Sequence, residues 1–335
     1  MEPLPSAGDA PQSAAATALE PPPRIKLRSL LLNSGLTLAL AGSVLWWAVR
    51  GVSSTQLREG LTGVRPWVVA ATMAVFTLTF FTVEIIGLGT SWRRSLDRTT
   101  AWRDIRTLVC GKQVLFFIQP LLTKIVAPIY FWKRARIRPT VSVSATEFVG
   151  IAEVFSVLVL VTLGLVVSDV GVGTGLTVTV AVSWIVIGLL AGMASARLQR
   201  RFPRLRTVGL LQAFTSATPR QAAFQVALRT GLLLVTLGCL WVLLAEMGAR
   251  LSLAQLLAFG PLFIYAATLP VSVGGFGGPQ GLAVMLLAGQ WAVLAPNRAL
   301  GFSLVWSTGI LLCESAVGLA HLPRLLELLG VRRSG

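Results

Sequence analysis

The stretch Leu269-Pro270-Val271-Ser272-Val273-Gly274-Gly275-Phe276-Gly277-Gly278-Pro279-Gln280-Gly281 carries the strongest structural signal in the chain. It packs five glycines and two prolines into thirteen residues, with apolar helical sequence on both sides. Gly and Pro interrupt helices, so in water this would be an ordinary loop. Non-helical backbone at membrane depth is tolerated only where it is buried in protein or lines a cavity. The stretch is therefore either a surface turn or the tip of a broken helix pair.

Composition places the chain among membrane proteins. Of its 335 residues, 54% are apolar and 13% are charged, compared with about 25% charged in soluble domains. Several uncharged runs approach the roughly 20 residues that cross a bilayer as a helix. They are too long for barrel strands. We therefore expect an all-α polytopic membrane protein.

The net charge of the chain indicates which kind of partner it binds. Its 29 Lys and Arg against 13 Asp and Glu give a net charge of +16. A nucleic-acid partner is one reading of such a balance. Basic residues of membrane proteins, however, collect in cytoplasmic loops beside anionic headgroups, so we expect membrane lipid and no nucleic acid. Three cysteines inside apolar segments and one histidine give no metal spacing, and we expect no cofactor.

Six apolar runs are long enough to be full spans. They are about Leu30–Val49, Trp67–Leu88, Glu147–Val167, Leu176–Ala194, Ala227–Glu246 and Ala299–Ala320. The fifth is expected to start earlier, because Thr218, Pro219 and Gln221 have the pattern of a capping box. Residues 1–23, rich in Ala, Pro and Ser, are expected to be a disordered tail. Residues 24–335 then form one transmembrane domain.

A second broken segment lies earlier in the chain. Leu108–Trp132 is apolar but contains Pro120 and several polar residues. It is long for one span and short for two, which predicts a re-entrant helix pair. The basic, Trp-containing segment between Trp92 and Arg106 precedes it and suits an interfacial helix.

The distribution of Lys and Arg predicts the orientation. If both termini are cytoplasmic and each broken pair returns to its own side, most basic residues face the cytoplasm, and the outer loop Ser168–Gly175 has none. We therefore expect a multi-pass protein of the cell inner membrane. The order span, span, broken pair, span occurs twice, in residues 28–170 and 171–322, with the second copy inverted. Many transporters have such inverted repeats, although the residue identities match poorly and coincidence among apolar helices is the alternative.

Ionisable residues inside spans are costly and are functional candidates by default. Three interpretations are open for those of this chain: structural Glu–Lys pairing, a polar path for a lipid headgroup or a proton, and snorkelling to the interface. The glycines of the late stretch allow close backbone approach, and helix N-termini beside it would offer N–H groups to a lipid phosphate. The candidate substrate-binding residues are Glu84, Lys112, Gln119, Lys124, Glu153, Ser272, Gly274, Gly275, Gly277, Gln280 and Glu314.

The late motif also carries a family resemblance. Pro270-Val271-Ser272-Val273-Gly274-Gly275-Phe276-Gly277, followed by a helix, resembles the lysylphosphatidylglycerol synthase transmembrane-region family, which is described as flippase-like. The family often continues into an Arg-Glu pair, and here the chain reads Gly278-Pro279-Gln280. The likeness covers most of the chain from Leu30, without a counterpart of the soluble aminoacyl-transferase domain. It implies lipid handling or translocation without lipid aminoacylation.

Three functions compete at this point. The first is a lipid transporter. The second is an accessory subunit that holds a lipid-modifying enzyme of a glycolipid or hopanoid pathway at the membrane, with the basic loop Arg197–Arg206 as its docking surface. The third is an embedded enzyme that uses Glu84, Glu153 or Glu314 as a base. The sequence contains no Ser/His/Asp set and no paired soluble carboxylates, so we rank the enzyme last and expect none.

Overall fold

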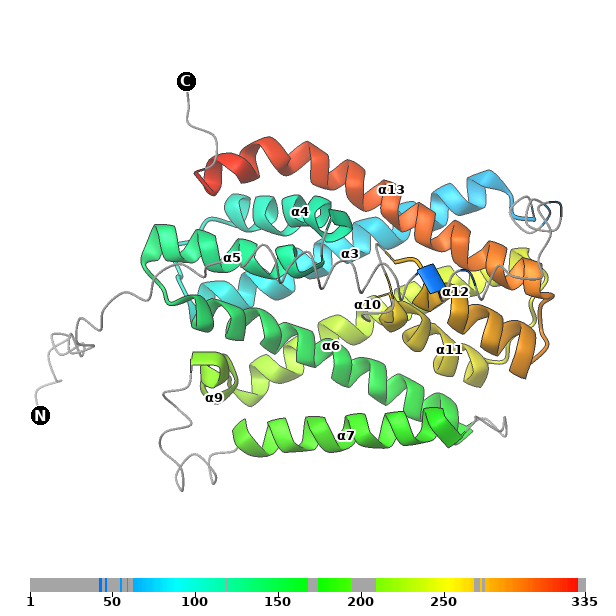
Figure 1. Cartoon of the computed structure of the whole chain (residues 1–335). Helices are drawn as coiled ribbons and strands as arrows, with labels where there is room; N and C mark the ends of the chain where they lie inside the picture. Colours follow the sequence, from blue (N-terminus) through cyan, green and yellow to red (C-terminus); the bar gives the residue numbers. More distant parts are fainter. Residues whose placement is uncertain are drawn as a thin grey trace, which may run out of the picture.

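The computed structural model describes residues 63–118, 120–167, 174–194, 209–267 and 275–330, together with the isolated residues 42, 43, 46, 55, 59 and 272. The described chain is an all-α polytopic membrane protein (Figure 1). Its elements are α3 (Pro66–Ser95), α4 (Trp102–Ile118), α5 (Pro120–Ala135), α6 (Pro139–Val167), α7 (Thr174–Ala194), η2 (Gly209–Leu211), α9 (Gln212–Ser216), α10 (Pro219–Glu246), α11 (Leu253–Ala266), α12 (Gly278–Ala283), the π-helical η3 (Val284–Gln290) and α13 (Pro296–Leu328).

Four of these helices are long and apolar enough to cross a membrane: α3, α6, α10 and α13. They contain four of the six predicted spans. The predicted span Leu176–Ala194 corresponds to α7, and Leu30–Val49 lies almost entirely outside the described residues. The capping box is confirmed, because Thr218 Oγ1 accepts a hydrogen bond from Gln221 N, and Thr218 N donates to Gln221 Oε1.

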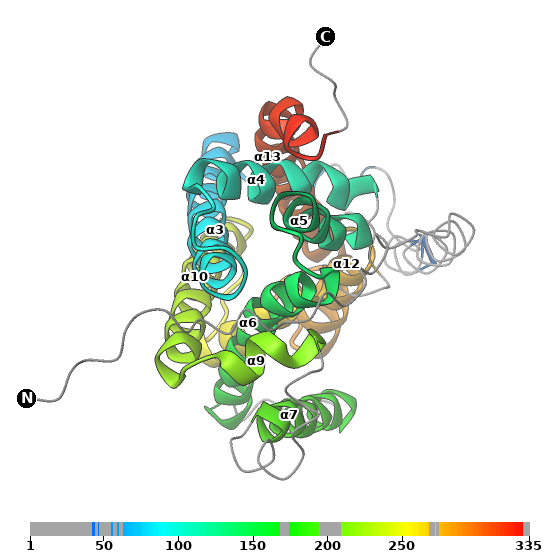
Figure 2. The same cartoon turned by 90° about the vertical axis from the view of Figure 1, so that its left-hand side faces the viewer.

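Helix α7 stands apart from the bundle. It packs against α6, and the view along the bundle places it at the rim (Figure 2). Its apolar side chains Val178, Val182, Ile185 and Leu189 are exposed. A soluble protein seldom leaves so large a contiguous apolar face uncovered. In a bilayer this face is matched by lipid chains.

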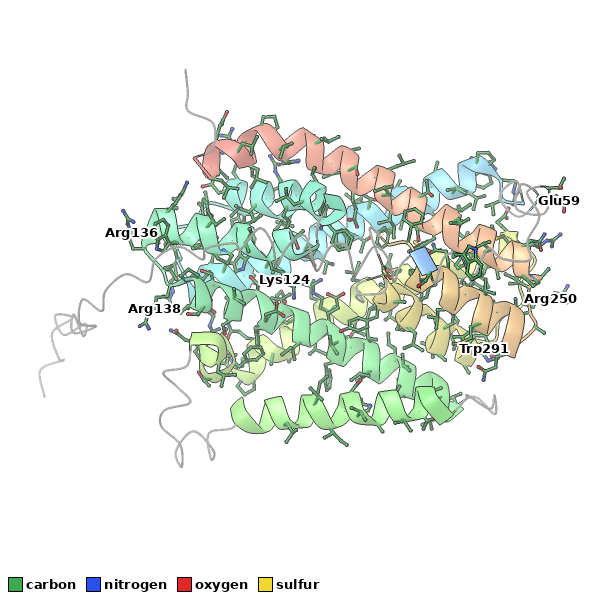
Figure 3. The ribbon with its side chains drawn as sticks, in the orientation of Figure 1. Glu59, Lys124, Arg136, Arg138, Arg250 and Trp291 are labelled. Carbon is green, nitrogen blue, oxygen red and sulfur yellow. The ribbon has the colours of Figure 1, made fainter. Side chains whose placement is uncertain are left out.

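Both broken segments form helix pairs. The first consists of α4 and α5, which break at Pro120, and the second consists of α11 and α12 with η3. The two pairs occupy opposite ends of the bundle (Figure 1). Arg136 and Arg138 lie at the end of the first pair, which we call the basic end, and Arg250 and Trp291 lie at the opposite end (Figure 3). The long helices run between the two ends.

The predicted interfacial helix after the second span is wrong. Helix α3 continues to Ser95, and α4 begins at Trp102 and extends into the broken pair. The turn between them is held by Asp97 Oδ1, which accepts hydrogen bonds from the amide and hydroxyl of Thr99 at 2.9 and 2.6 Å. These hydrogen bonds hold the pKa of the Asp97 carboxyl below its usual range. A tight, capped turn leaves no room for a separate surface helix.

The helix contacts follow a regular scheme. Helix α4 packs on α13, and α11 packs on α6. Helices α3 and α10 pack on each other, α3 also contacts α13, and α10 also contacts α6. Exchanging α3 with α10, α4 with α11 and α6 with α13 leaves the contact between α3 and α10 unchanged and converts each of the other four into another of the four. The contact between α3 and α6 has no comparable counterpart between α10 and α13.

The apolar core is divided into two clusters, one around each broken pair. One contains Phe259 and Phe263 of α11 with Leu240 of α10. The other contains Leu108 of α4 and Phe131 of α5. Helices α3, α6 and α13 contribute to both clusters and carry Glu84, Glu153 and Glu314 between these contributions. Helix α10 contributes only to the cluster around α11, and its Arg229 precedes that contribution. The charged residues thus form a layer between two apolar cores.

Candidate functional site

Arg229 of α10 lies at the centre of this polar layer and is only 2% exposed. Its Nη1 donates to Glu84 Oε1 on α3 and, at 3.3 Å, to Glu153 Oε2 on α6. Glu84 Oε2 also accepts from Lys112 Nζ on α4 at 3.5 Å. These four residues and Glu314 of α13, which borders the same cavity as Glu153 and Arg229, are called the central charged cluster below.

Pairing explains how the central charged cluster can be buried. A single charge inside a membrane helix is expensive, and a buried ion is tolerated when a counter-ion and hydrogen bonds replace its water. Glu84 has both a guanidinium and an ammonium group within reach. The predicted structural Glu–Lys pairing is therefore present for Lys112, with Arg229 as the closer partner of the same carboxylate.

Glu314 differs from the other two glutamates of the cluster. Its residue is 6% exposed, and it makes no hydrogen bond or ion pair within the part of the chain that the structure describes. The other two carboxylates share Arg229. Among the described residues, Glu314 is thus a buried acid that borders a cavity without a direct partner.

The cavity lies between the two broken pairs and has a volume of about 170 Å³. From the first pair it is lined by Gln113 and Phe116, and from the second by Phe263, Gly275 and Pro279. Aromatic and aliphatic side chains form most of the remaining wall, while Glu153, Arg229, Ser307 and Glu314 supply polar groups. Mostly apolar walls with a few converging polar groups are the usual character of small-molecule sites.

The described residues of the glycine stretch, Ser272 and 275–281, form a tip beside this cavity. Ser272 Oγ donates to Ala266 O at 2.6 Å and accepts from Gly278 N at 3.1 Å. Gln280 Oε1 accepts from Gly277 N at 2.6 Å. Ser272, Gly277 and Gln280 are buried, so the described part of the stretch, Ser272 and residues 275–281, lies inside the protein and does not fit a surface turn.

The side chain of Gln280 connects the tip to α13. Its Nε2 donates to Ser307 Oγ at 3.0 Å and to Ser303 O at 3.3 Å, and Ser307 Oγ donates to Gly275 O at 2.8 Å. Gly275 and Gly277 have φ values of +83° and +104°, a region that favours glycine. The N–H groups of Gly277 and Gly278 donate hydrogen bonds to Gln280 and Ser272 within the tip, so these two side chains position the tip. Gly275 borders the cavity.

Three predicted site residues lie elsewhere or outside the described residues. Lys124 Nζ donates to Glu147 Oε1 at 2.9 Å, in a pair whose side chains are 58% and 40% exposed. This pair is outside the central charged cluster. Gln119 and Gly274 lie outside the described residues, as does the Arg197–Arg206 loop.

A second polar network fastens the first broken pair at the basic end. Asp104 of α4 accepts hydrogen bonds from Tyr130 Oη at 3.1 Å and Arg134 Nη1 at 3.0 Å, both on α5. Its other oxygen accepts from Arg324 of α13 at 3.4 Å. The network ties both arms of the pair to the last helix.

Arg229 was not among the residues predicted for the site. In the predicted span Ala227–Glu246 it lies near the N-terminal end, where a basic side chain can reach the interface. The capping box starts the helix at Pro219, which puts Arg229 ten residues along it, or about 15 Å at 1.5 Å per residue. That depth is the signal by which the sequence could have identified it.

Comparisons with known proteins leave the chain without an assigned family. No family model, no curated protein and no solved structure matches it. The resemblance to the lysylphosphatidylglycerol synthase transmembrane-region family stays a prediction.

Proposed function

We propose that this protein binds a lipid or lipid-linked substrate and moves it across the cell inner membrane, as a flippase-like transporter. The observation that carries the proposal is the cavity bordered by both broken pairs. Its lining is amphipathic, with the apolar walls that a lipid's apolar part requires and the buried charges that a headgroup requires. About 170 Å³ corresponds to a handful of waters at roughly 30 Å³ each, so it suits part of a headgroup, with the acyl chains left in the bilayer.

The helix contacts support an inverted repeat as the framework of this transporter. Residues 28–170 and 171–322 would be the two halves, and the exchange of α3 with α10, α4 with α11 and α6 with α13 would relate their contacts. The broken pairs enter from opposite ends of the bundle (Figure 1). Transporters built this way hold the substrate near the midplane and alternate access by moving one repeat against the other.

The orientation belongs to the same proposal. The basic end, with Arg136 and Arg138, would face the cytoplasm, since basic segments concentrate on that side. The first broken pair then enters from the cytoplasm and the second from outside. Both termini would be cytoplasmic. The family resemblance to flippase-like proteins agrees with this assignment of function.

The direct test is lipid movement in liposomes. The protein is reconstituted with fluorescent anionic, aminoacylated and isoprenoid lipids, and a membrane-impermeant quencher reports the lipid that remains in the inner leaflet. Ile310 borders the cavity, and Leu312, two residues away on α13, is 64% exposed. Ile310→Trp is expected to abolish movement and Leu312→Trp to preserve it. Absence of protein-dependent movement for every lipid would rule out this function, and unchanged movement in Ile310→Trp would rule out the cavity as its site.

A further inference from the structure

The charges around the cavity do not balance. The central charged cluster contains three carboxyl groups and two basic groups, so full ionisation leaves one negative charge in excess. Glu84 and Glu153 share Arg229, and Glu84 also contacts Lys112. Glu314 has no such contact in the described structure. The excess charge therefore falls on Glu314.

We propose that Glu314 is a proton-binding site of the cavity and that its deprotonation draws Lys112 away from Glu84. The proposal rests on the proposed transport function, because it identifies the ion that would be coupled to lipid movement. A buried carboxyl without a counter-ion is far cheaper to keep neutral than charged. A metal cation would need several oxygen ligands, and the described residues contain no group of three or more His, Cys, Asp or Glu side chains that could hold one.

The groups that face Glu314 are few. Helix α3 presents Glu84 and α4 presents Lys112, while the described residues of α12 and η3 carry no charge. Across the cavity lie Arg229 of α10 and Glu153 of α6. Arg229 is held by two carboxylates from two helices. Lys112 is the cation that can change partner, because its contact with Glu84 is long, at 3.5 Å.

The step involves a proton and a change of ion pair. The proton leaves the carboxyl of Glu314 for a water molecule in the cavity, and the new carboxylate attracts the ammonium group of Lys112. Glu84 keeps Arg229, so it does not become an unpaired charge. Since Lys112 lies on α4 and Glu314 on α13, the exchange tightens the first broken pair against the last helix and loosens it from α3.

Infrared spectroscopy tests the proton site without any substrate. The protein in lipid is titrated from neutral to alkaline pH, and the C=O stretch of protonated carboxyl groups is followed. Wild type is expected to lose one such band as the pH rises. The band should be absent from Glu314→Gln, shifted in Glu314→Asp and retained in Glu153→Gln. A band that persists in Glu314→Gln, or is unshifted in Glu314→Asp, overturns the proposal, as does the absence of any such band from wild type.

A second measurement separates this proposal from the transport proposal. In the liposome assay at a series of symmetrical pH values, wild-type lipid movement is expected to depend on pH and that of Glu314→Gln to lose this dependence. If the infrared band behaves as expected and no lipid moves in wild type, the proton site stands and the lipid function is wrong. If lipid moves with the same pH dependence in Glu314→Gln, the lipid function stands and the coupling is wrong.

Discussion

Replacing Arg229 by Met should destabilise the protein more than any other single change to its ion pairs. The side chain is 2% exposed and bonds Glu84 and Glu153. Methionine fills a similar volume but leaves two carboxylates without their guanidinium group. Removing one partner of a buried ion pair costs about 3–5 kcal/mol. Because Lys112 offers Glu84 only a contact of 3.5 Å, it should not compensate for the lost guanidinium group, and we expect a cost within this range of free energy.

The assay is equilibrium unfolding in mixed micelles with increasing SDS, followed by the fluorescence of the ten tryptophans. Arg65→Met is the matched control, because Arg65 also pairs with a glutamate, Glu246, and its side chain is 62% exposed. Exposed pairs contribute little to stability, so this variant should unfold close to wild type. The reasoning is refuted if Arg229→Met shifts the unfolding midpoint no further than Arg65→Met.

A double variant checks that the lost stability comes from unpaired charge. Arg229→Met combined with Glu84→Gln removes a cation and an anion together, and replacing both members of a buried pair is often close to neutral. The double variant should therefore lose less stability than the sum of the losses of the two single variants. An additive result would mean that Arg229 acts through packing alone.

Three further outcomes are expected. Gly164→Ala should cost about 1–3 kcal/mol, because its new Cβ would lie 2.5 Å from the backbone nitrogen of Ala258, whereas Gly238→Ala, with open space around it, should be neutral in the same unfolding assay. Gln280→Met should cost about 1–3 kcal/mol, since it leaves the buried N–H of Gly277 without its acceptor; a variant as stable as wild type would show that the tip holds itself. The pKa of the Asp97 carboxyl is depressed in the folded protein, so its ionised form stabilises the α3–α4 turn at pH values above the unfolded carboxyl pKa of about 4. This stabilisation is lost as the pH falls through the folded pKa. The protection of the turn amides relative to their intrinsic hydrogen-exchange rate should therefore fall in acid, and Asp97→Asn should remove this extra acid sensitivity.

Local signals in the sequence predicted much of the fold. The apolar runs predicted the long helices, Pro120 marked the break in the first pair, and Thr218 and Gln221 marked the start of α10. Each of these depends on residues close together in the chain, where propensity and capping act. The interfacial helix was wrong because a basic, Trp-containing segment also suits a helix end, and the hydrogen bonds to Asp97 decided between the two.

The site was predictable only in part, because it joins residues that are far apart in the sequence. Apolar surroundings identified Glu84, Glu153 and Glu314 one at a time, but no local pattern pairs Glu84 with a residue 145 positions later. The same holds for Gln280, a predicted substrate-binding residue, because no local pattern predicts its bonds to Ser303 and Ser307 of α13. Long-range pairing depends on which helices pack together, and this is determined by the whole bundle.

The separation between Glu84 and Arg229 also has a consequence for synthesis. At about 5–20 residues per second, a ribosome needs roughly 7–30 s to add the 145 residues that separate them. During that interval Glu84 exists without its guanidinium partner. Lys112, only 28 positions after Glu84, arrives within a few seconds at the same rate. Of the two basic residues that contact Glu84 in the finished protein, the lysine is therefore synthesised well before the arginine.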